Sequence, residues 1–201
     1  MLSAKMDTEE EKKFIAQIKE AIARKRGYAD FFCWPPNRDL EEFGIVSEFC
    51  ESLEKNGQLF FNRDSVKGRG RGNDPPDFEA KDLLGNYIGI EVTELVDSAA
   101  IETLKNTGVY EWAEWDRAKI IRVIDERLSA KDKPAQVKGG PYVSYVIIIH
   151  TDEPSLNVSY ITSLLKDVRF TKRKLIDRAF LFFSYDPEIK IYPYVELEFS
   201  T

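Results

Sequence analysis

The chain has 201 residues, 43% of them hydrophobic and 12% aromatic, which excludes a disordered or fibrous chain and suits one globular domain with a substantial core. No apolar run is long enough to cross a bilayer and the charged N-terminus is unlike a signal peptide, so we expect a cytoplasmic protein that does not contact membranes. The formal net charge of −6 counts mildly against a nucleic-acid role, although the distribution of charge matters more than its sum.

The chain is poor in metal-binding sulfur and imidazole side chains. Cys33 and Cys50 are too few for a disulfide framework, so we interpret them as reduced thiols, with Cys50 as a small core residue. His150 is the single histidine, which excludes a zinc site built from several histidines.

The first predicted helix begins at the capping box Thr8-Glu9-Glu10-Glu11 and ends near Gly27. An irregular aromatic stretch over residues 29–37 follows, and we interpret it as a strap over the core. We therefore expect residues 1–38 to form an N-terminal helix and aromatic strap packed on the core, and residues 39–201 to form a single domain.

A second helix is predicted from Asp39, a plausible N-cap, to Lys55. Glu42 lies one turn before Val46 on the buried stripe of this helix, which makes it a candidate acidic ligand. The spacing of Asp39 and Glu42 also matches a capping box, in which Glu42 would only reach back to the cap. Both interpretations stay open.

The next strand is expected to begin at residues 59–61 and to end in a loop where basic residues alternate with glycine. Lys67, Arg69 and Arg71 of this loop are candidates for binding nucleic-acid phosphates. A second basic cluster between Lys166 and Arg178 could serve the same purpose or form a solvated face.

The central stretch of the chain is predicted to be a hairpin. Residues 77–83 form one strand and residues 87–95 the next, joined by the turn-like Gly85-Asn86. Strand side chains alternate between faces, and Glu91 lies in an apolar run, where a carboxylate is costly unless it is paired or binds a metal. The hairpin would bring Asp77 beside Glu91, where the two could share a divalent cation.

Pro76-Asp77, followed by Glu91-Val92-Thr93 on a hydrophobic strand, resembles the PD-(D/E)xK nuclease superfamily, whose members have the restriction-endonuclease-like fold. The resemblance implies that Asp77 and Glu91 are metal-binding and catalytic residues for Mg²⁺ or Mn²⁺, with Glu42 as a further acidic ligand. The family's lysine, two residues after the glutamate, is replaced here by Thr93. The motif covers only about twenty residues, so the order of the surrounding elements must support it.

In some members of the superfamily the catalytic lysine has moved to the helix after the glutamate strand. That helix is predicted here over residues 110–130, and Lys119 is the first candidate for the migrated lysine, with Lys131 as the second. One stripe of this helix would hold Trp112, Trp115, Lys119 and Val123. In the alternative interpretation, Lys119 lays its aliphatic stem across Trp115 and keeps its ammonium in water.

The C-terminal third predicts a central strand at residues 142–150, a helix capped by Ser155 and extending to Lys166, and a hairpin of residues 179–185 and 189–199. Pro193 indicates that the last strand is an edge strand or is interrupted. The order α-β-β-β-α-β over residues 39–150 matches the restriction-endonuclease-like core, which implies a three-layer α/β/α fold with a central mixed sheet.

Three functions remain open. The first is a Mg²⁺-dependent nuclease of the restriction or genome-defence type, acting on nucleic acid, DNA rather than RNA, and dimeric if it cuts both strands of a duplex. The second is a catalytically inactive relative that binds nucleic acid or a protein partner. The third is an unrelated α/β protein in which Asp77 caps a turn and Glu91 pairs with an arginine.

Overall fold

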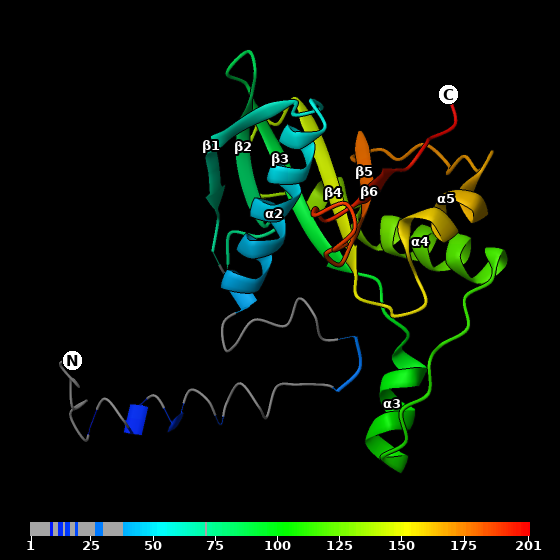
Figure 1. Ribbon diagram of the computed structural model, residues 1–201. Coiled ribbons are helices and arrows are strands. Elements are labelled where there is room, and N and C mark those ends of the chain that lie inside the picture. The colour runs from blue at the N-terminus through cyan, green and yellow to red at the C-terminus, as the bar shows by residue number, and fades with distance from the viewer. Residues whose placement is uncertain are drawn as a thin grey trace.

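The structure, a computed structural model, describes residues 27–29, 38–70 and 72–201, together with isolated positions between 9 and 19. The predictions for the helix at 8–26 and the strap at 30–37 therefore lie largely outside the described residues, as do those for Cys33 and Arg71. The described part is a mixed α/β structure with a six-stranded mixed sheet and four α-helices (Figure 1).

The described part of the chain contains eleven helices and strands, counting one 3₁₀ helix. In chain order they are α2 (Arg38–Lys55), β1 (Phe61–Gly68), β2 (Phe78–Asp82), β3 (Tyr87–Glu94), α3 (Ser98–Thr107), α4 (Arg117–Lys131), the 3₁₀ helix η1 (Pro134–Gln136), β4 (Ser144–Thr151), α5 (Val158–Leu165), β5 (Arg178–Phe183) and β6 (Tyr194–Glu196). None of the helices in this described part combines the length and the apolar character that crossing a membrane requires.

The strands lie in the sheet in the same order as in the chain, from β1 to β6. The pairs β1–β2, β2–β3 and β5–β6 are antiparallel, whereas β3–β4 and β4–β5 are parallel. The predicted hairpin of β2 and β3, the central position of β4 and the edge position of the last strand are confirmed. Helices lie between the parallel pairs because parallel strands need a crossover connection.

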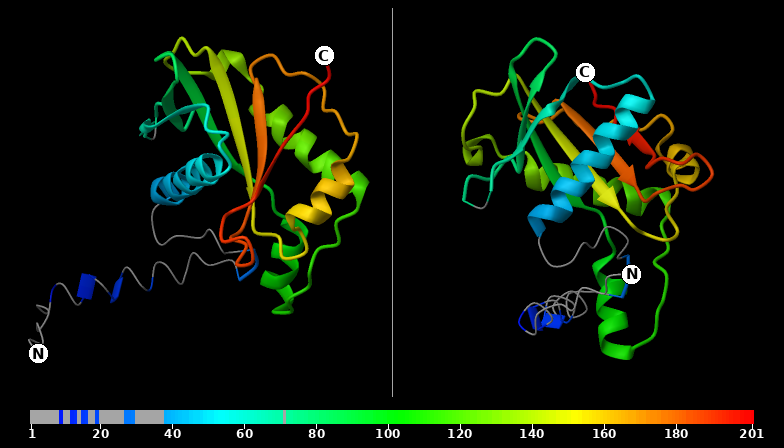
Figure 2. Two further views of the ribbon diagram at one scale, coloured as in Figure 1. Left: turned by 45° about the horizontal axis from the view of Figure 1, so that its top comes forward. Right: turned by 60° about the vertical axis from the view of Figure 1, so that its left-hand side comes forward.

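Each face of the sheet packs against different helices, as the left view of Figure 2 shows. On one face, Ile88, Ile90 and Val92 of β3 pack with α2 residues such as Phe49. On the other face, side chains of β4 and β5 pack with α4 and α5. Because successive strand residues point to opposite faces, Glu91 belongs to the α4 face.

The predicted helix over residues 110–130 begins later than expected. Asp116 is its N-cap and accepts a hydrogen bond from the backbone N–H of Lys119 at 2.7 Å, so α4 begins at Arg117. Helix α3 lies between β3 and α4, and Asp97 caps it by accepting the backbone N–H of Ala100 at 2.9 Å. These two aspartate caps set helix boundaries that apolar periodicity alone does not reveal.

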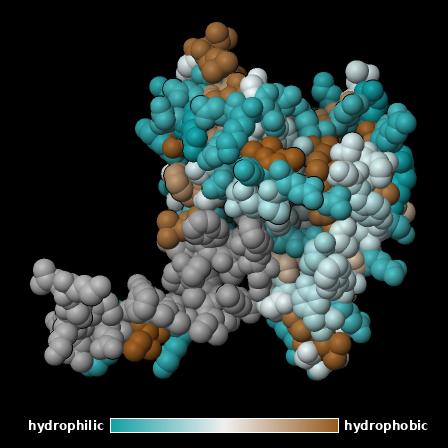
Figure 3. All heavy atoms as spheres, viewed as in Figure 1, coloured by the Kyte–Doolittle hydropathy of each residue, from teal (hydrophilic) through white to brown (hydrophobic). Residues whose placement is uncertain are grey.

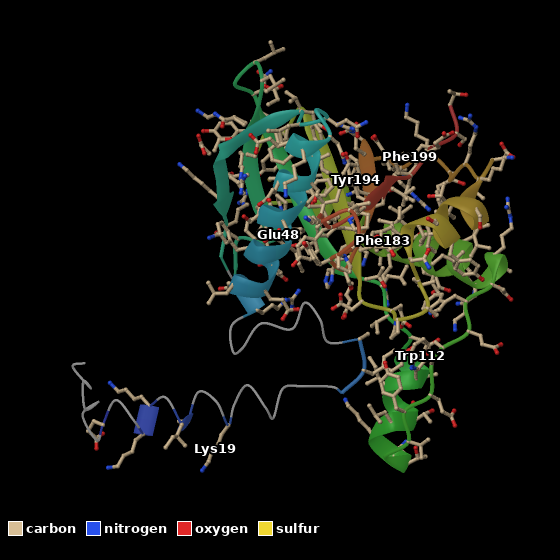
Figure 4. All side chains as sticks on the ribbon, viewed as in Figure 1. Lys19, Glu48, Trp112, Phe183, Tyr194 and Phe199 are labelled. Carbon is tan, nitrogen blue, oxygen red and sulfur yellow. The ribbon has the colours of Figure 1, made fainter. Side chains whose placement is uncertain are left out.

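The two tryptophans expected on one helical stripe lie in the irregular segment before α4. Trp112 lies beside α3 and away from the sheet (Figure 4), whereas Trp115 is buried. The predicted stripe of Trp112, Trp115 and Lys119 is therefore wrong, because a helical stripe requires continuous helix.

Two further predicted caps are corrected. Asn157, not Ser155, caps α5 by accepting the N–H of Tyr160 at 2.9 Å, while Ser155 donates to the carbonyl of Ala113. Helix α2 begins at Arg38, so Asp39 lies inside its first turn.

The tip of the β2–β3 hairpin is apolar and exposed. Leu83 and Leu84 are there, and Figure 3 shows the knob they form at the top of the molecule. Asp82 holds the turn by accepting the N–H groups of Leu84 and Asn86. This tip is at the opposite end of the hairpin from Asp77.

Candidate functional site

Asp77 and Glu91 meet at the open end of the β2–β3 hairpin. The antiparallel register pairs Phe78 with Ile90, and continuing it by one position sets Asp77 opposite Glu91. Opposite residues of an antiparallel pair project from the same face, with Cβ atoms roughly 5 Å apart. Both side chains line one cavity of about 260 Å³. The expected approach of these two carboxylates is therefore present.

Asp77 is fixed at both its backbone and its side chain. Its carbonyl accepts the backbone N–H of Arg69 at 2.9 Å, and its Oδ2 accepts the N–H of Val92 at 2.8 Å. Burial, and next the charge of Glu91, raise the pKa of Asp77 to about 6, against the smaller opposing effect of the Val92 hydrogen bond. A divalent cation at this place would offset the repulsion that Glu91 exerts on the ionised Asp77.

Glu91 is 3% exposed and has a partner on each oxygen. The ammonium of Lys131, the last residue of α4, lies on Oε1, and the hydroxyl of Tyr145 donates to Oε2 at 3.0 Å. A buried carboxylate requires such compensation. The lysine that reaches the site is thus Lys131, the second candidate from the sequence.

Lys119 is held elsewhere. Its Nζ lies 2.6 Å from Asp97 Oδ2 and 2.8 Å from the carbonyl oxygen of Glu114, and it stacks over the Trp115 ring at 4.4 Å. Lys119 is in the first turn of α4 and Lys131 in the last, so about 18 Å of helix separates them. The structure does not bring Lys119 to Asp77 and Glu91, and the alternative of a lysine stem laid across Trp115 describes it better.

Glu42 lies near Asp77 but has a different partner. It accepts a hydrogen bond from Arg38 Nε at 2.6 Å, and both residues line a cavity of about 760 Å³ together with Asp77. Burial, and next the charge of Asp77, raise the pKa of Glu42. Within the described residues no three or more Asp, Glu, His or Cys side chains are grouped to hold a metal ion, so Glu42 does not join Asp77 and Glu91 in one cluster.

The two cavities meet at Arg38, Asp74 and Asp77, which line both. The larger one lies against the first turns of α2 and the glycine loop, and the smaller one contains Glu91 and Lys131. Asp77 therefore stands where a groove along α2 opens onto the paired carboxylates.

The basic loop residues differ in how they are used. Lys67 is exposed on β1, opposite Glu79 in the register. Arg69 is largely buried: its guanidinium bonds the Tyr142 hydroxyl and lies 3.6 Å from Glu79. Arg71 lies outside the described residues. The structure thus leaves Lys67 accessible and commits Arg69 to contacts within the protein.

Basic residues of the second cluster form ion pairs with acidic residues of the protein. Arg173 pairs with Asp125, and Arg178 pairs with Glu196 at 2.7 Å. Of the two alternatives for this cluster, the structure favours surface residues that carry their own counter-charges.

The carboxylate pair fits a small hard cation. Mg²⁺ binds to proteins through one or two carboxylates and keeps several of its waters. Asp77 and Glu91 would hold it, since they provide oxygen donors from one face and repel each other. The same donors suit Mn²⁺.

Gly89, Tyr145 and Arg38 belong to this site and were not singled out from the sequence. Gly89 lies two residues before Glu91 on the same face of β3. Tyr145 on β4 is the register partner of Gly89. A tyrosine at the start of an aliphatic strand was the available signal, because a buried hydroxyl needs a partner. Arg38 offered no signal of its own.

No protein-family model, no curated protein and no solved structure matches the chain.

Proposed function

We propose that this protein is a Mg²⁺- or Mn²⁺-dependent nuclease of the PD-(D/E)xK type, in which Asp77 and Glu91 hold the cation and Lys131 takes the role of the motif lysine. The observation that carries the proposal is the meeting of Asp77, Glu91 and the Lys131 ammonium at one cavity. The helices on both faces of the mixed sheet support a three-layer, restriction-endonuclease-like core for residues 39–201.

Hydrolysis of a phosphodiester needs a water held in line with the bond to be broken and compensation of the charge that develops on the phosphoryl oxygens. A bound divalent cation would stabilise that charge and lower the pKa of its water. Glu91 anchors the Lys131 ammonium beside this position, from which it can orient the attacking water. Thr93, at the usual lysine position, is uncharged and cannot do so.

Arg38 is suited to bind the phosphate. Its side chain is 65% exposed and lines both cavities, and its charge offsets a small part of the rise in the pKa of Asp77 that burial and Glu91 cause. Arginine binds phosphate through paired N–H groups, and the salt bridge to Glu42 orients it. Arg38 would thus give a strand of DNA a positive contact in the groove, and Lys67 is exposed on β1. Cleavage of both strands of a duplex would require a homodimer.

A catalytically inactive module that binds nucleic acid or a protein partner is the second candidate. Two observations favour it: Thr93 supplies no charge at the usual lysine position, and Arg69 is paired with Tyr142 and Glu79 within the protein. Such a protein would bind DNA in a salt-sensitive manner without cutting it.

The test combines cation binding and cleavage. Mg²⁺ at about 100 times its dissociation constant should raise the melting temperature of the wild type by roughly 5 to 10 °C. Glu91→Gln should abolish that rise, whereas Glu94→Gln on the same strand should keep it. Plasmid, single-stranded DNA and RNA are then incubated with each variant and Mn²⁺ or Mg²⁺.

Cleavage that disappears in Asp77→Asn, Glu91→Gln and Lys131→Met would support the nuclease. Cation binding without cleavage, together with salt-sensitive DNA binding, would support the inactive module. A wild-type melting temperature that ignores both cations would reject the metal site.

A further inference from the structure

Tyr145 and Gly89 form a contact that bears directly on Glu91. They are register partners on the adjacent strands β4 and β3. A Cβ atom at Gly89 would lie 2.9 Å from Cδ2 of Tyr145 and 3.2 Å from Cγ of Pro76. Real Cβ atoms essentially never come within 3.0 Å of another heavy atom, so the Tyr145 ring can occupy this place only because residue 89 has no side chain.

From this place the Tyr145 hydroxyl reaches Glu91, two residues along the same face of β3. It donates to Oε2 at 3.0 Å, and Lys131 occupies Oε1. Tyr145 is 2% exposed and Glu91 3% exposed, so water cannot readily replace the hydrogen bond between them. A carboxylate with a donor on each oxygen has its rotation fixed, because any turn about its terminal bond would break both hydrogen bonds.

We propose that Tyr145 is a positioning residue for the cation site: its hydroxyl fixes the plane of the Glu91 carboxylate so that the remaining lone pairs face Asp77, and Gly89 provides the space for its ring. This inference rests on the proposed function, since it assigns a role within the same metal site. Tyr145 acts through Glu91 and touches neither substrate nor cation.

The tyrosine does not serve as a base. Burial, and next the charge of Glu91, raise the pKa of Tyr145 above its ordinary value. The hydroxyl therefore keeps its proton at neutral pH and can donate it to Glu91.

Packing alone does not require the hydroxyl. The Tyr145 ring belongs to the apolar cluster of the α4 face, a role that phenylalanine would fill equally well. The oxygen atom is used for one bond, to Glu91. Tyr145→Phe therefore removes the positioning bond and keeps the ring over Gly89.

The experiment measures binding of Mg²⁺ and of Mn²⁺, each alone, to the full-length chain by the rise in melting temperature and by calorimetry. Removing a partner that orients a metal ligand typically weakens metal binding by roughly 10- to 100-fold, which is the loss expected for Tyr145→Phe. The matched control is Tyr160→Phe, whose hydroxyl donates to the carbonyl of Trp115 at 2.6 Å, away from the site. The control should bind both cations as the wild type does.

A second variant tests the role of Gly89. Gly89→Ala should displace the ring and weaken cation binding to about the same extent as Tyr145→Phe. The double variant should bind no more weakly than Tyr145→Phe alone, because residues that act through one contact are not additive. Tyr145→Phe decides the question by itself if Gly89→Ala does not fold.

The outcomes separate this inference from the proposed function. Unchanged cation binding in Tyr145→Phe, with a wild type that binds, overturns the role of Tyr145 and leaves the metal site standing. A wild type that binds neither cation overturns both. Weaker binding in Tyr145→Phe with an unaffected Tyr160→Phe supports the inference.

Discussion

Lys131 and Glu91 are 40 positions apart in the sequence and form a salt bridge. The Glu91 side chain is 4% exposed and the Lys131 side chain is 29% exposed. Lys131 ends α4, and the C-terminus of a helix favours a positive charge. The ammonium therefore compensates a buried carboxylate that would otherwise be costly to ionise, and solvent can still reach it. In this position the Lys131 ammonium can balance the charge of Glu91 in the cation site and can also contact a water molecule beside that site.

Lys131→Met should separate these two roles. Removing one partner of a buried ion pair leaves an uncompensated charge, so the free energy of unfolding should fall by about 3 kcal/mol at pH 7.5. Saturating Mg²⁺ should recover part of this loss, because the ion supplies the missing charge at Glu91. Urea unfolding with and without Mg²⁺ measures both quantities. An equal loss under the two conditions would contradict the shared position of ammonium and cation.

Because of Asp77, the free energy of unfolding should be larger in mild acid than at neutral pH. Its pKa is raised to about 6 from an ordinary 3.8, so the folded state holds the proton more tightly than the unfolded chain. The contribution of Asp77 to stability therefore falls as the pH rises from about 4 to about 6 and is constant above about 7. Asp77→Asn, whose amide oxygen can still accept the Val92 N–H, should be more stable at pH 7.5 by on the order of 2 to 3 kcal/mol.

The control for this prediction is Asp74→Asn. Asp74 lies three positions earlier, and hydrogen bonds from backbone N–H groups, that of Gly72 among them, hold its pKa below the ordinary value. Its neutral variant should gain no stability at pH 7.5. Urea unfolding between pH 4 and 8 compares the two, and an unchanged pH profile in Asp77→Asn would contradict the assignment.

Much of the β2–β3 hairpin could be predicted because its signals are local. Gly85 and Asn86 mark the turn, and alternation then assigns Glu91 to the face opposite Ile90. The approach of Asp77 to Glu91 follows from these two facts. The end of α2 at Lys55, the central position of β4 and the edge position of β6 were likewise indicated by local patterns.

The identity of the lysine could not be predicted, because it depends on where α4 begins and how it crosses the sheet. Apolar periodicity extends back toward Tyr110, but Asp116 caps α4. Lys119 therefore lies in the first turn of α4, at the end of the helix far from Glu91. The use of Arg69 was also hidden, since its partner Tyr142 comes from a distant loop. Contacts between remote segments leave no periodic trace in the sequence.

Lys119→Met should affect stability and not the cation site. The ammonium pairs with Asp97 and lies over Trp115, with 26% of the side chain exposed, so its removal should cost about 1 kcal/mol. The rise in melting temperature with Mg²⁺ should equal that of the wild type. If Lys119→Met lost the rise in melting temperature with Mg²⁺, Lys119 rather than Lys131 would be the lysine of the cation site.

Glu153 should prove to be a structural carboxylate rather than a second site. It is 2% exposed, and its oxygens accept the Tyr28 hydroxyl at 2.7 Å, the Trp115 indole N–H at 3.1 Å and the Asp97 N–H at 2.6 Å. Glu153→Ala leaves buried donors unpaired, so the free energy of unfolding should fall by about 3 kcal/mol. Near-ultraviolet circular dichroism should report the loosened Trp115, while Mg²⁺ binding at Asp77 should persist. Loss of Mg²⁺ binding in a folded Glu153→Ala would show instead that this carboxylate supports the metal site.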